Sequence, residues 1–265
     1  IRASRRKLKE IVERRLDGYD FVAIVLDGKS FGDDGLIMAV GVTTGGKKVL
    51  LGIIQSGSEN HVVCSDFLKS LINRGLRYED GLLCVIDGAK GFRKAITEVF
   101  GVHGIIQRCQ WHKRENIVRY LPKKMQSEFR KKLQAAYEKE DYDKAKTALL
   151  GIKKELSLIN KSAVASMEDG FEESLTVLSL GLPRELRRSL KTTNIIESVL
   201  ALVGQKTDKV DYWKNSDQKQ RWVATALLDI EPRLNRVCGY RYLKNLRNAL
   251  QREILQGKRK EAAAA

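Results

Sequence analysis

Two aspartates follow apolar runs in this sequence, and each is followed directly by a glycine. Residues 21–26 lead into Asp27, and residues 82–86 lead into Asp87. One interpretation is two unrelated strand ends with turn-forming Asp-Gly pairs, which are common. The other is that the two strands are parallel neighbours. Their carboxylates would then meet at one edge of the sheet, where open α/β sheets build their sites.

Two carboxylates that lie together repel each other unless a cation shares them. Hard oxygen ligands suit Mg²⁺ or Mn²⁺. A pair of such ions about 4 Å apart activates a nucleophile and stabilises a leaving oxygen in phosphoryl transfer. Asp27 and Asp87 are therefore candidate ligands for divalent cations, and in a basic protein this chemistry fits nucleic-acid phosphodiesters.

A third carboxylate is expected beside this pair, and the candidate is Glu197 in the segment KTTNIIESVLALV. With Asn194 as the N-cap of a helix, Glu197 falls at the capping-box position, and the residues alone favour that structural role. Spacing also leaves other acids open as the third ligand, namely Glu168, Asp169, Glu172, Glu173 and Glu185.

Cys109 and His112 form a Cys-x-x-His pair in RCQWHKREN. A structural zinc needs four ligands, and the sequence holds no second pair at suitable spacing, so no zinc is expected. A catalytic Cys-His dyad is conceivable but unusual between such close neighbours. The GKS at residues 28–30 is not a P-loop, because the glycine needed five places before Gly28 is Ala23.

The charge balance points to a polyanionic partner. Lys and Arg total 49 against 33 acids in 265 residues, which gives a net charge of +16. A merely basic soluble protein is the alternative. The scattered cysteines indicate a reducing, intracellular compartment, and no apolar run approaches a membrane span. Because the chain begins at Ile1 with a highly charged segment, we expect an upstream part that is absent here.

Hydrophobic patterning predicts the elements that position these residues. A basic helix is expected at residues 1–17, followed by a strand at 21–27. A hairpin of two strands is expected at 35–57, with its turn at Gly45-Gly46, and a helix follows at 59–74. A strand at 82–87, a helix at 90–101 and a strand at 103–109 follow. The first three strands form an antiparallel meander, and the crossover helices add two parallel strands, so the sheet is mixed.

The second half of the chain is predicted to be helical. From residue 113 to about 190 apolar residues recur every three or four positions, and further helices are expected at 192–203 and 216–236. The helical block therefore reads as an insertion into the α/β unit. Trp213 and Trp222 lie in apolar contexts, which favours core packing over stacking on bases.

Four segments resemble the transposases of the IS256/Mutator superfamily. They are VLDGKSF, VIDGAKGFRKAITEVFG, IIQRCQWHKRENI and KTTNIIESVL, and the resemblance spans roughly residues 20 to 245. It implies an RNase H-like α/β core: a mixed five-stranded sheet in the order β-β-β-α-β-α-β-α, with an all-α insertion before the last catalytic helix. It also implies a catalytic and metal-binding triad of Asp27, Asp87 and Glu197, with Cys109 and His112 as active-site support.

The same resemblance implies a function and a division of the chain. The expected activity is cleavage and strand transfer of DNA with two Mg²⁺ or Mn²⁺ ions. The partners are terminal inverted repeats, target DNA and further copies of the chain, in a prokaryotic nucleoid. The expected parts are a basic linker (1–17) from an absent DNA-binding region, a catalytic core (18–121 and 190–250), an all-α insertion (122–189) and a basic, Ala-rich tail (251–265).

Two departures and two alternatives accompany this assignment. The first departure is that Glu197-Ser198 is followed by Val199-Leu200 and a segment with few arginines, which weakens the expected DNA contact there. The second is the absence of the family's N-terminal DNA-recognition region, so little sequence-specific binding of DNA ends is expected. Another RNase H-like nuclease or resolvase, or a catalytically silent DNA-binding module, remains open. The candidate DNA contacts in and beside the insertion are Lys123, Lys124, Arg130, Lys131, Lys132, Arg184, Arg187, Arg188 and Lys191, although a solvated helix face is the simpler interpretation for any one of them.

Overall fold

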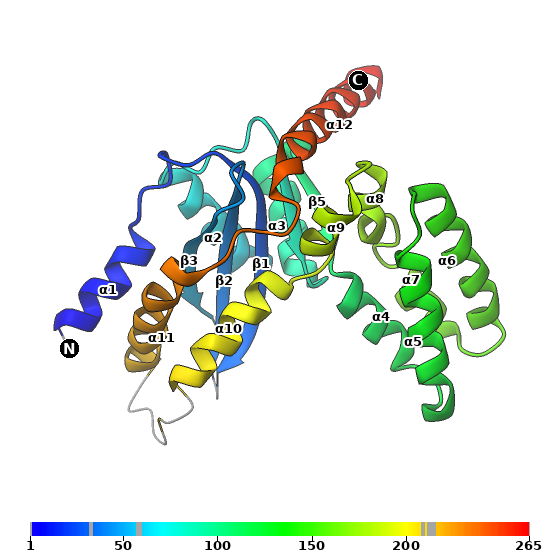
Figure 1. Cartoon of the computed structure of the whole chain (residues 1–265), viewed down its shortest axis with the longest axis horizontal. Helices are drawn as coiled ribbons and strands as arrows, with labels where there is room; N and C mark the ends of the chain where they lie inside the picture. The colour runs from blue at the N-terminus through cyan, green and yellow to red at the C-terminus, as the bar shows by residue number, and fades with distance from the viewer. Residues whose placement is uncertain (1, 32–33, 57–59, 208–209, 211–215, 265) are drawn as a thin grey trace.

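The chain folds around one mixed β-sheet, shown in Figure 1. This computed structural model describes residues 2–31, 34–56, 60–207, 210 and 216–264. The strand order is β3-β2-β1-β4-β5, in which β1 pairs with β2 and β2 with β3 in antiparallel fashion, whereas β1–β4 and β4–β5 are parallel. The strands are β1 (Phe21–Phe31), β2 (Asp34–Thr43), β3 (Lys48–Gln55), β4 (Leu82–Ile86) and β5 (Gly104–Arg108). The predicted meander and the two added parallel strands are confirmed.

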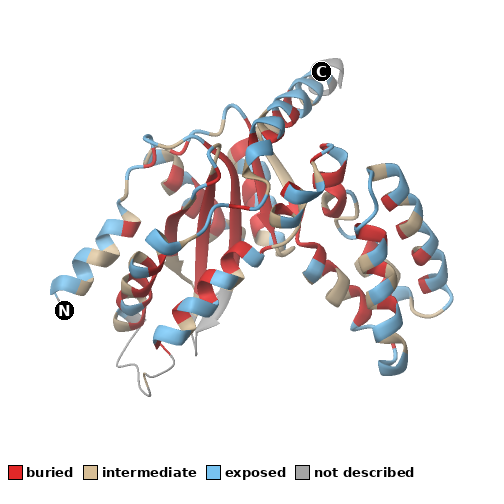
Figure 2. Cartoon of the chain, in the orientation of Figure 1, coloured by how far each residue is buried: buried red, intermediate tan, exposed pale blue. Residues whose placement is uncertain are grey.

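The central strands are apolar throughout because helices cover both faces of the sheet. Alternate side chains of β1 enter two separate cores: Ile24 and Leu26 belong to one, and Ala23 and Val25 to the other. The first core is closed by α2 (His61–Asn73) and α3 (Lys90–Phe100). Figure 2 shows the resulting band of buried residues along the strands.

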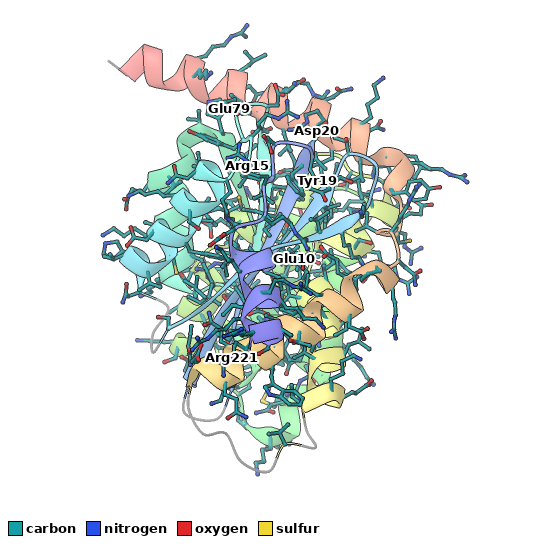
Figure 3. All side chains as sticks on the ribbon, turned by 90° about the vertical axis from the view of Figure 1, so that its left-hand side faces the viewer. Glu10, Arg15, Tyr19, Asp20, Glu79 and Arg221 are labelled. Carbon is teal, nitrogen blue, oxygen red and sulfur yellow. The ribbon has the colours of Figure 1, made fainter. Side chains whose placement is uncertain are left out.

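The opposite face carries helices from both ends of the chain. They are α1 (Arg2–Val12), α9 (Arg184–Leu190), α10 (Asn194–Thr207), α11 (Ser216–Ile230) and α12 (Leu243–Ala264). Arg247 of α12 fixes the start of β1 by an ion pair of 2.6 Å to Asp20, which is labelled in Figure 3. Within the described residues, the helices are all too short or too polar to cross a membrane.

A group of helices stands beside the sheet, on the right in Figure 1. They are α4 (Gln110–Val118), α5 (Lys123–Tyr137), α6 (Tyr142–Ser157), α7 (Lys161–Glu168) and α8 (Thr176–Ser179). They share a third apolar core, drawn from residues 117 to 178. Short 3₁₀ turns at Gly101–His103, Glu172–Leu175, Glu231–Arg233 and Tyr240–Tyr242 complete the described elements. The predicted strand-free block is confirmed.

A buried polar joint connects these helices to the sheet. The Gln107 side chain donates to the Ser174 carbonyl at 3.1 Å and accepts from the Val177 amide at 2.8 Å. Arg108, 4% exposed, donates to the Asp169 carboxylate at 2.5 Å. Gly170 has a positive φ of 67° and lies so close that an added Cβ would meet Arg108 Nε at 2.6 Å. Specific polar contacts therefore add to apolar packing here, since Val177 also belongs to one of the two cores beside the sheet.

Two expectations about individual elements differ from the structure. Trp222 was expected in the core, but it is 45% exposed, because the neighbouring Val223 and Ala224 face the sheet. Trp213 lies outside the described residues. The hairpin turn between β2 and β3 spans residues 44–47, with the Gly46 amide donating to the Thr43 carbonyl at 2.8 Å, so it is longer than a two-residue turn.

Candidate active site

Strand register brings Asp27 and Asp87 together. Leu26 of β1 is paired with Ile86 of β4 in parallel, so the two aspartates are the next residues on adjacent strands. Because side chains alternate between faces, Asp27 follows Val25 and Asp87 follows Val85 on the face that α10 covers. The expected meeting of the two aspartates at one sheet edge is confirmed by the strand pairing.

Asp27 does not end its strand, which corrects one expectation. β1 continues to Phe31, paired only with β2, in which Met38 is the partner of Asp27. The hairpin partner satisfies the backbone beyond the point where β4 stops, so no turn is needed at Gly28. At Asp87 the chain does turn: Gly88 has a positive φ of 116°, and the Asp87 carboxylate accepts from the Ala89 amide at 2.9 Å.

The electrostatics of Asp27 are unusual. The side chain is 7% exposed, and its pKa is raised from 3.8 to about 7. Burial is the largest cause, followed by repulsion from Asp87; Glu197 also raises it, while His112 opposes the shift. Four titratable groups from distant parts of the sequence therefore act on one another here. Glu197 reaches this cluster despite the insertion.

Backbone hydrogen bonds hold the segments at both ends of the insertion near the site. The amide of Cys109, just after β5, donates to the Ile86 carbonyl at 2.7 Å, which places it beside the end of β4. The amide of the next residue, Gln110, donates to the Lys191 carbonyl at 2.9 Å. The chain thus leaves the sheet at residue 110 and comes back at residue 191, three residues before α10 begins.

Glu197 lies in the first turn of α10, but it does not form the expected capping box. The helix begins at Asn194, so the cap position belongs to Thr193 and Glu197 lies one residue too late to reach back to the cap amide. Its carboxylate Oε1 instead accepts a 2.8 Å hydrogen bond from the Thr193 hydroxyl. The Asn194 cap assignment was wrong by one residue, because the Thr-Thr-Asn run offers three possible cap residues.

Cys109 and His112 lie next to each other and interact. A hydrogen bond with Cys109 is the largest cause that raises the pKa of His112 to about 9; burial opposes it, and the Cys109, Asp27 and Glu197 charges add to it. Burial alone would raise the pKa of the Cys109 thiol, but hydrogen bonds to His112 and the charge of His112 lower it overall. This pair brings positive charge to a cluster of carboxylates.

Cys109, His112 and Glu197 also offer three ligand atoms within 4.8 Å of one another. The Thr193 hydroxyl oxygen contacts all three residues, at 3.6 Å from the Cys109 sulfur, 3.4 Å from His112 Nδ1 and 2.8 Å from Glu197 Oε1. Sequence reasoning missed Thr193. The available signal was a hydroxyl residue four positions before the candidate glutamate, one helical turn away.

The other acids that spacing left open have partners in or beside the insertion. Asp169 and Glu173 form ion pairs with Arg108, at 2.5 and 3.2 Å. Glu172 pairs with Lys146 and Glu168 with Lys153, while Glu185 lies on α9 at a cavity of about 480 Å³. Among these candidates for the third carboxylate, Glu197 is the one whose charge raises the pKa of Asp27.

The candidate DNA contacts fall into two groups. Lys123, Lys124 and Lys131 are exposed on α5, whereas Arg130 and Lys132 of the same helix pair with Glu115, Glu128 and Glu155. Arg184, Arg187, Arg188 and Lys191 line the cavity of about 480 Å³, which lies between the joint and α9. Lys191 pairs there with Glu138. The last residue of the second group is Lys191, whose carbonyl accepts from the Gln110 amide two residues before Thr193.

A model of the family described as "Transposase, Mutator family" matches residues 5–235. The chain belongs to this family. The match covers the sheet, the helices of the insertion and α10, so it includes Asp27, Asp87, Cys109, His112 and Glu197.

Bacterial insertion-sequence transposases are among the relatives of this family member. The transposase for ISRM5 of Rhizobium meliloti is 29% identical over 244 residues, covering 89% of this chain and 59% of the relative. That for IST2 of Acidithiobacillus ferrooxidans is 34% identical over 174 residues (66% and 57%). That for IS256 in transposon Tn4001 of Staphylococcus aureus is 28% identical over 196 residues (73% and 48%). The chain spans about half the length of these curated relatives.

Proposed function

We propose that this chain is the RNase H-like catalytic core of a DDE transposase, which cleaves DNA at element ends and joins it to target DNA. The observation that carries the proposal is the convergence of Asp27, Asp87 and Glu197 from β1, the end of β4 and α10. The strand order β3-β2-β1-β4-β5, with a helical insertion before the glutamate helix, supports it. Membership of the Mutator family and the names of the relatives agree with it.

The residues present fit divalent cations. The pKa of the buried Asp27 is raised by burial and by two neighbouring carboxylates even though His112 opposes the shift, so the carboxylates carry more negative charge than His112 offsets. Asp27, Asp87 and Glu197 would hold Mg²⁺ or Mn²⁺ through carboxylate oxygens, which these hard ions prefer. When bound, two such ions activate the attacking oxygen and stabilise the leaving oxygen of a phosphodiester.

The protein's own part in the reaction is positioning and charge. β1 and β4 fix the two aspartates on a buried sheet, and Arg108 holds the Gly88 carbonyl at 3.2 Å, which restrains the turn next to Asp87. The attacking oxygen would be that of water for cleavage and that of a DNA 3′-hydroxyl for joining. His112 brings positive charge beside the carboxylates, where a phosphate carries negative charge.

The basic surface supports DNA as the substrate. The net charge of +16 favours a polyanion through counterion release, and four cations, Arg184, Arg187, Arg188 and Lys191, line one cavity at α9. The terminal repeats, the target DNA and a dimer or larger assembly on DNA belong to the same proposal. The proposal also includes the division of the chain into a catalytic core and an insertion at residues 122–189, and association of the protein with the bacterial nucleoid.

A strand-transfer assay separates this function from its alternatives. The substrate is a duplex oligonucleotide that carries the terminal repeats flanking the coding sequence, with plasmid as the target. A transposase joins the 3′-hydroxyl of the oligonucleotide to the plasmid in the presence of Mg²⁺ or Mn²⁺. A nuclease or resolvase cuts without joining the ends to the target. A silent DNA-binding module shifts the DNA in a gel without either product.

A further inference from the structure

The Thr193 hydroxyl lies where three functional side chains converge. Thr193 is fully buried, and its oxygen is within 3.6 Å of the Cys109 sulfur, His112 Nδ1 and Glu197 Oε1. Cys109 and His112 come from the end of β5 and the first turn of α4, whereas Thr193 and Glu197 come from the start of α10. The Thr193 hydroxyl therefore contacts side chains that come before the insertion in the sequence and one that comes after it.

Donor counting fixes the direction of the hydrogen bonds. A hydroxyl has one proton to donate and two lone pairs to accept with, whereas an ionised carboxylate can only accept. The shortest contact, 2.8 Å to Glu197 Oε1, therefore takes the Thr193 proton. The contact to His112 Nδ1 at 3.4 Å is then satisfied when that nitrogen carries hydrogen and donates to Thr193. The chain of donation runs from His112 through Thr193 to Glu197.

We propose that Thr193 is a positioning residue, which fixes the carboxylate of Glu197 for metal binding by linking it to the Cys109–His112 pair. This rests on the proposed function, because it takes Glu197 as a metal ligand. It also gives Cys109 and His112 a role: His112 donates to the Thr193 hydroxyl, and Cys109 is a hydrogen-bond partner of His112. One oxygen of Glu197 is held by Thr193, which leaves the other carboxylate oxygen to face a cation.

Metal binding by Cys109, His112 and Glu197 themselves is the competing assignment. Their ligand atoms lie within 4.8 Å of one another, and Cys and His suit zinc. The Thr193 hydroxyl, however, lies within 3.6 Å of the Cys109 sulfur, His112 Nδ1 and Glu197 Oε1, and Glu197 Oε1 already accepts its proton. The geometry therefore favours a hydroxyl-centred cluster.

The test compares two substitutions of Thr193, one that removes its hydroxyl group and one that removes its methyl group. Thr193→Val keeps the shape and removes the donor, whereas Thr193→Ser keeps the donor and removes the methyl group. The measurements are Mn²⁺-dependent plasmid nicking over a range of Mn²⁺ concentrations, and Mn²⁺ binding by calorimetry. We expect Thr193→Val to need about 10-fold more Mn²⁺ for half-maximal binding and nicking, in line with the effect of outer-shell partners. Thr193→Ser should stay within a few-fold of the wild type.

The double variant Thr193→Val/Glu197→Gln shows whether the two residues act as one unit. If Thr193 acts through Glu197, adding Thr193→Val to Glu197→Gln should cause little further loss, because effects within one network are not additive. The inference would be overturned if Thr193→Val nicked DNA and responded to Mn²⁺ like the wild type. It would also be overturned if folded Thr193→Ser and Thr193→Val lost nicking and Mn²⁺ affinity equally. Stoichiometric zinc in the purified protein that Cys109→Ser removes would favour the competing assignment.

The design separates this inference from the proposed function. If Glu197→Gln nicks DNA like the wild type, the function assigned to Glu197 is wrong, and the inference with it. If Glu197→Gln is inactive while Thr193→Val is unaffected, only the role of Thr193 is wrong. Melting temperatures of all variants, measured without metal, identify any loss that comes from misfolding.

Discussion

At the scale of single residues, the raised pKa of Asp27 makes the metal-free protein sensitive to pH. Its pKa of about 7 in the folded state exceeds the ordinary 3.8, mainly because of burial and secondly because of Asp87. The folded state therefore binds a proton more tightly than the unfolded state, so stability from this group is present at low pH. It is lost as pH rises from about 4 to about 7, by an amount on the order of 4 kcal/mol.

Asp27→Asn should therefore stabilise the metal-free protein at pH 8, because it removes a buried charge that two other carboxylates repel. The check is thermal unfolding in chelator at pH 5 and pH 8. The variant should gain melting temperature over the wild type at pH 8 and little at pH 5. Mn²⁺ at pH 8 should stabilise the wild type far more than the variant. An unchanged difference between the two pH values would contradict the electrostatic assignment.

A substitution at Glu197 distinguishes a structural role of this residue from a role in metal binding. A residue that only accepts the Thr193 hydrogen bond can be replaced by Gln with little loss, whereas a metal ligand acts through its charge. Glu197→Gln should melt close to the wild-type temperature but lose about 10²-fold or more in cleavage rate. Calorimetric melting and plasmid nicking on the same preparation measure both. Normal cleavage by the variant would remove Glu197 from the triad.

At the scale of elements, the joint between the sheet and the insertion depends on Arg108. Its guanidinium is 4% exposed and holds Asp169, Glu173 and the Gly88 carbonyl. Arg108→Met removes the buried donor that these groups share, so the free energy of unfolding should fall by about 2–3 kcal/mol. Arg93→Met is the matched control, because Arg93 also pairs with Glu173 but is largely exposed; its cost should be about 0–1 kcal/mol. Urea unfolding of both variants is the measurement, and equal losses would contradict a buried joint.

The sequence predicted elements better than the contacts between them. That Asp27 and Asp87 lie on neighbouring strands could be predicted from local pattern. Each aspartate follows an apolar run, and side chains alternate between the two faces of a strand. The extension of β1 beyond Asp27 could not, because it depends on the partner strand β2, which satisfies the backbone there. The Thr193 contacts could not either, since they join residues 81 and 84 positions apart. Packing of the whole insertion decides whether such residues meet.

At the scale of the whole molecule, the excess of positive charge should act on DNA through its phosphates. Affinity should fall steeply with salt, and each lost phosphate contact should reduce the slope of log affinity against log salt by about 1. Arg184→Ala and Arg188→Ala, which remove cations that line the cavity at α9, should reduce both affinity and slope. Lys154→Ala, exposed on α6, is the control and should change neither. Fluorescence anisotropy with a duplex oligonucleotide over a salt series measures this, and a flat series would remove the basic surface from DNA binding.

The central claim is that carboxylates brought together by β1, β4 and α10 carry out metal-dependent chemistry on DNA. The most direct measurement compares wild type and Asp87→Asn for Mn²⁺-dependent plasmid nicking, with DNA affinity measured on the same preparations. Asp87 lies at the turn after β4, half-buried, so replacement by Asn keeps the fold. We predict that nicking by the variant falls to background while its DNA affinity stays within about two-fold of the wild type, since nonspecific affinity comes from the basic surface. Nicking by Asp87→Asn at the wild-type rate would contradict the claim.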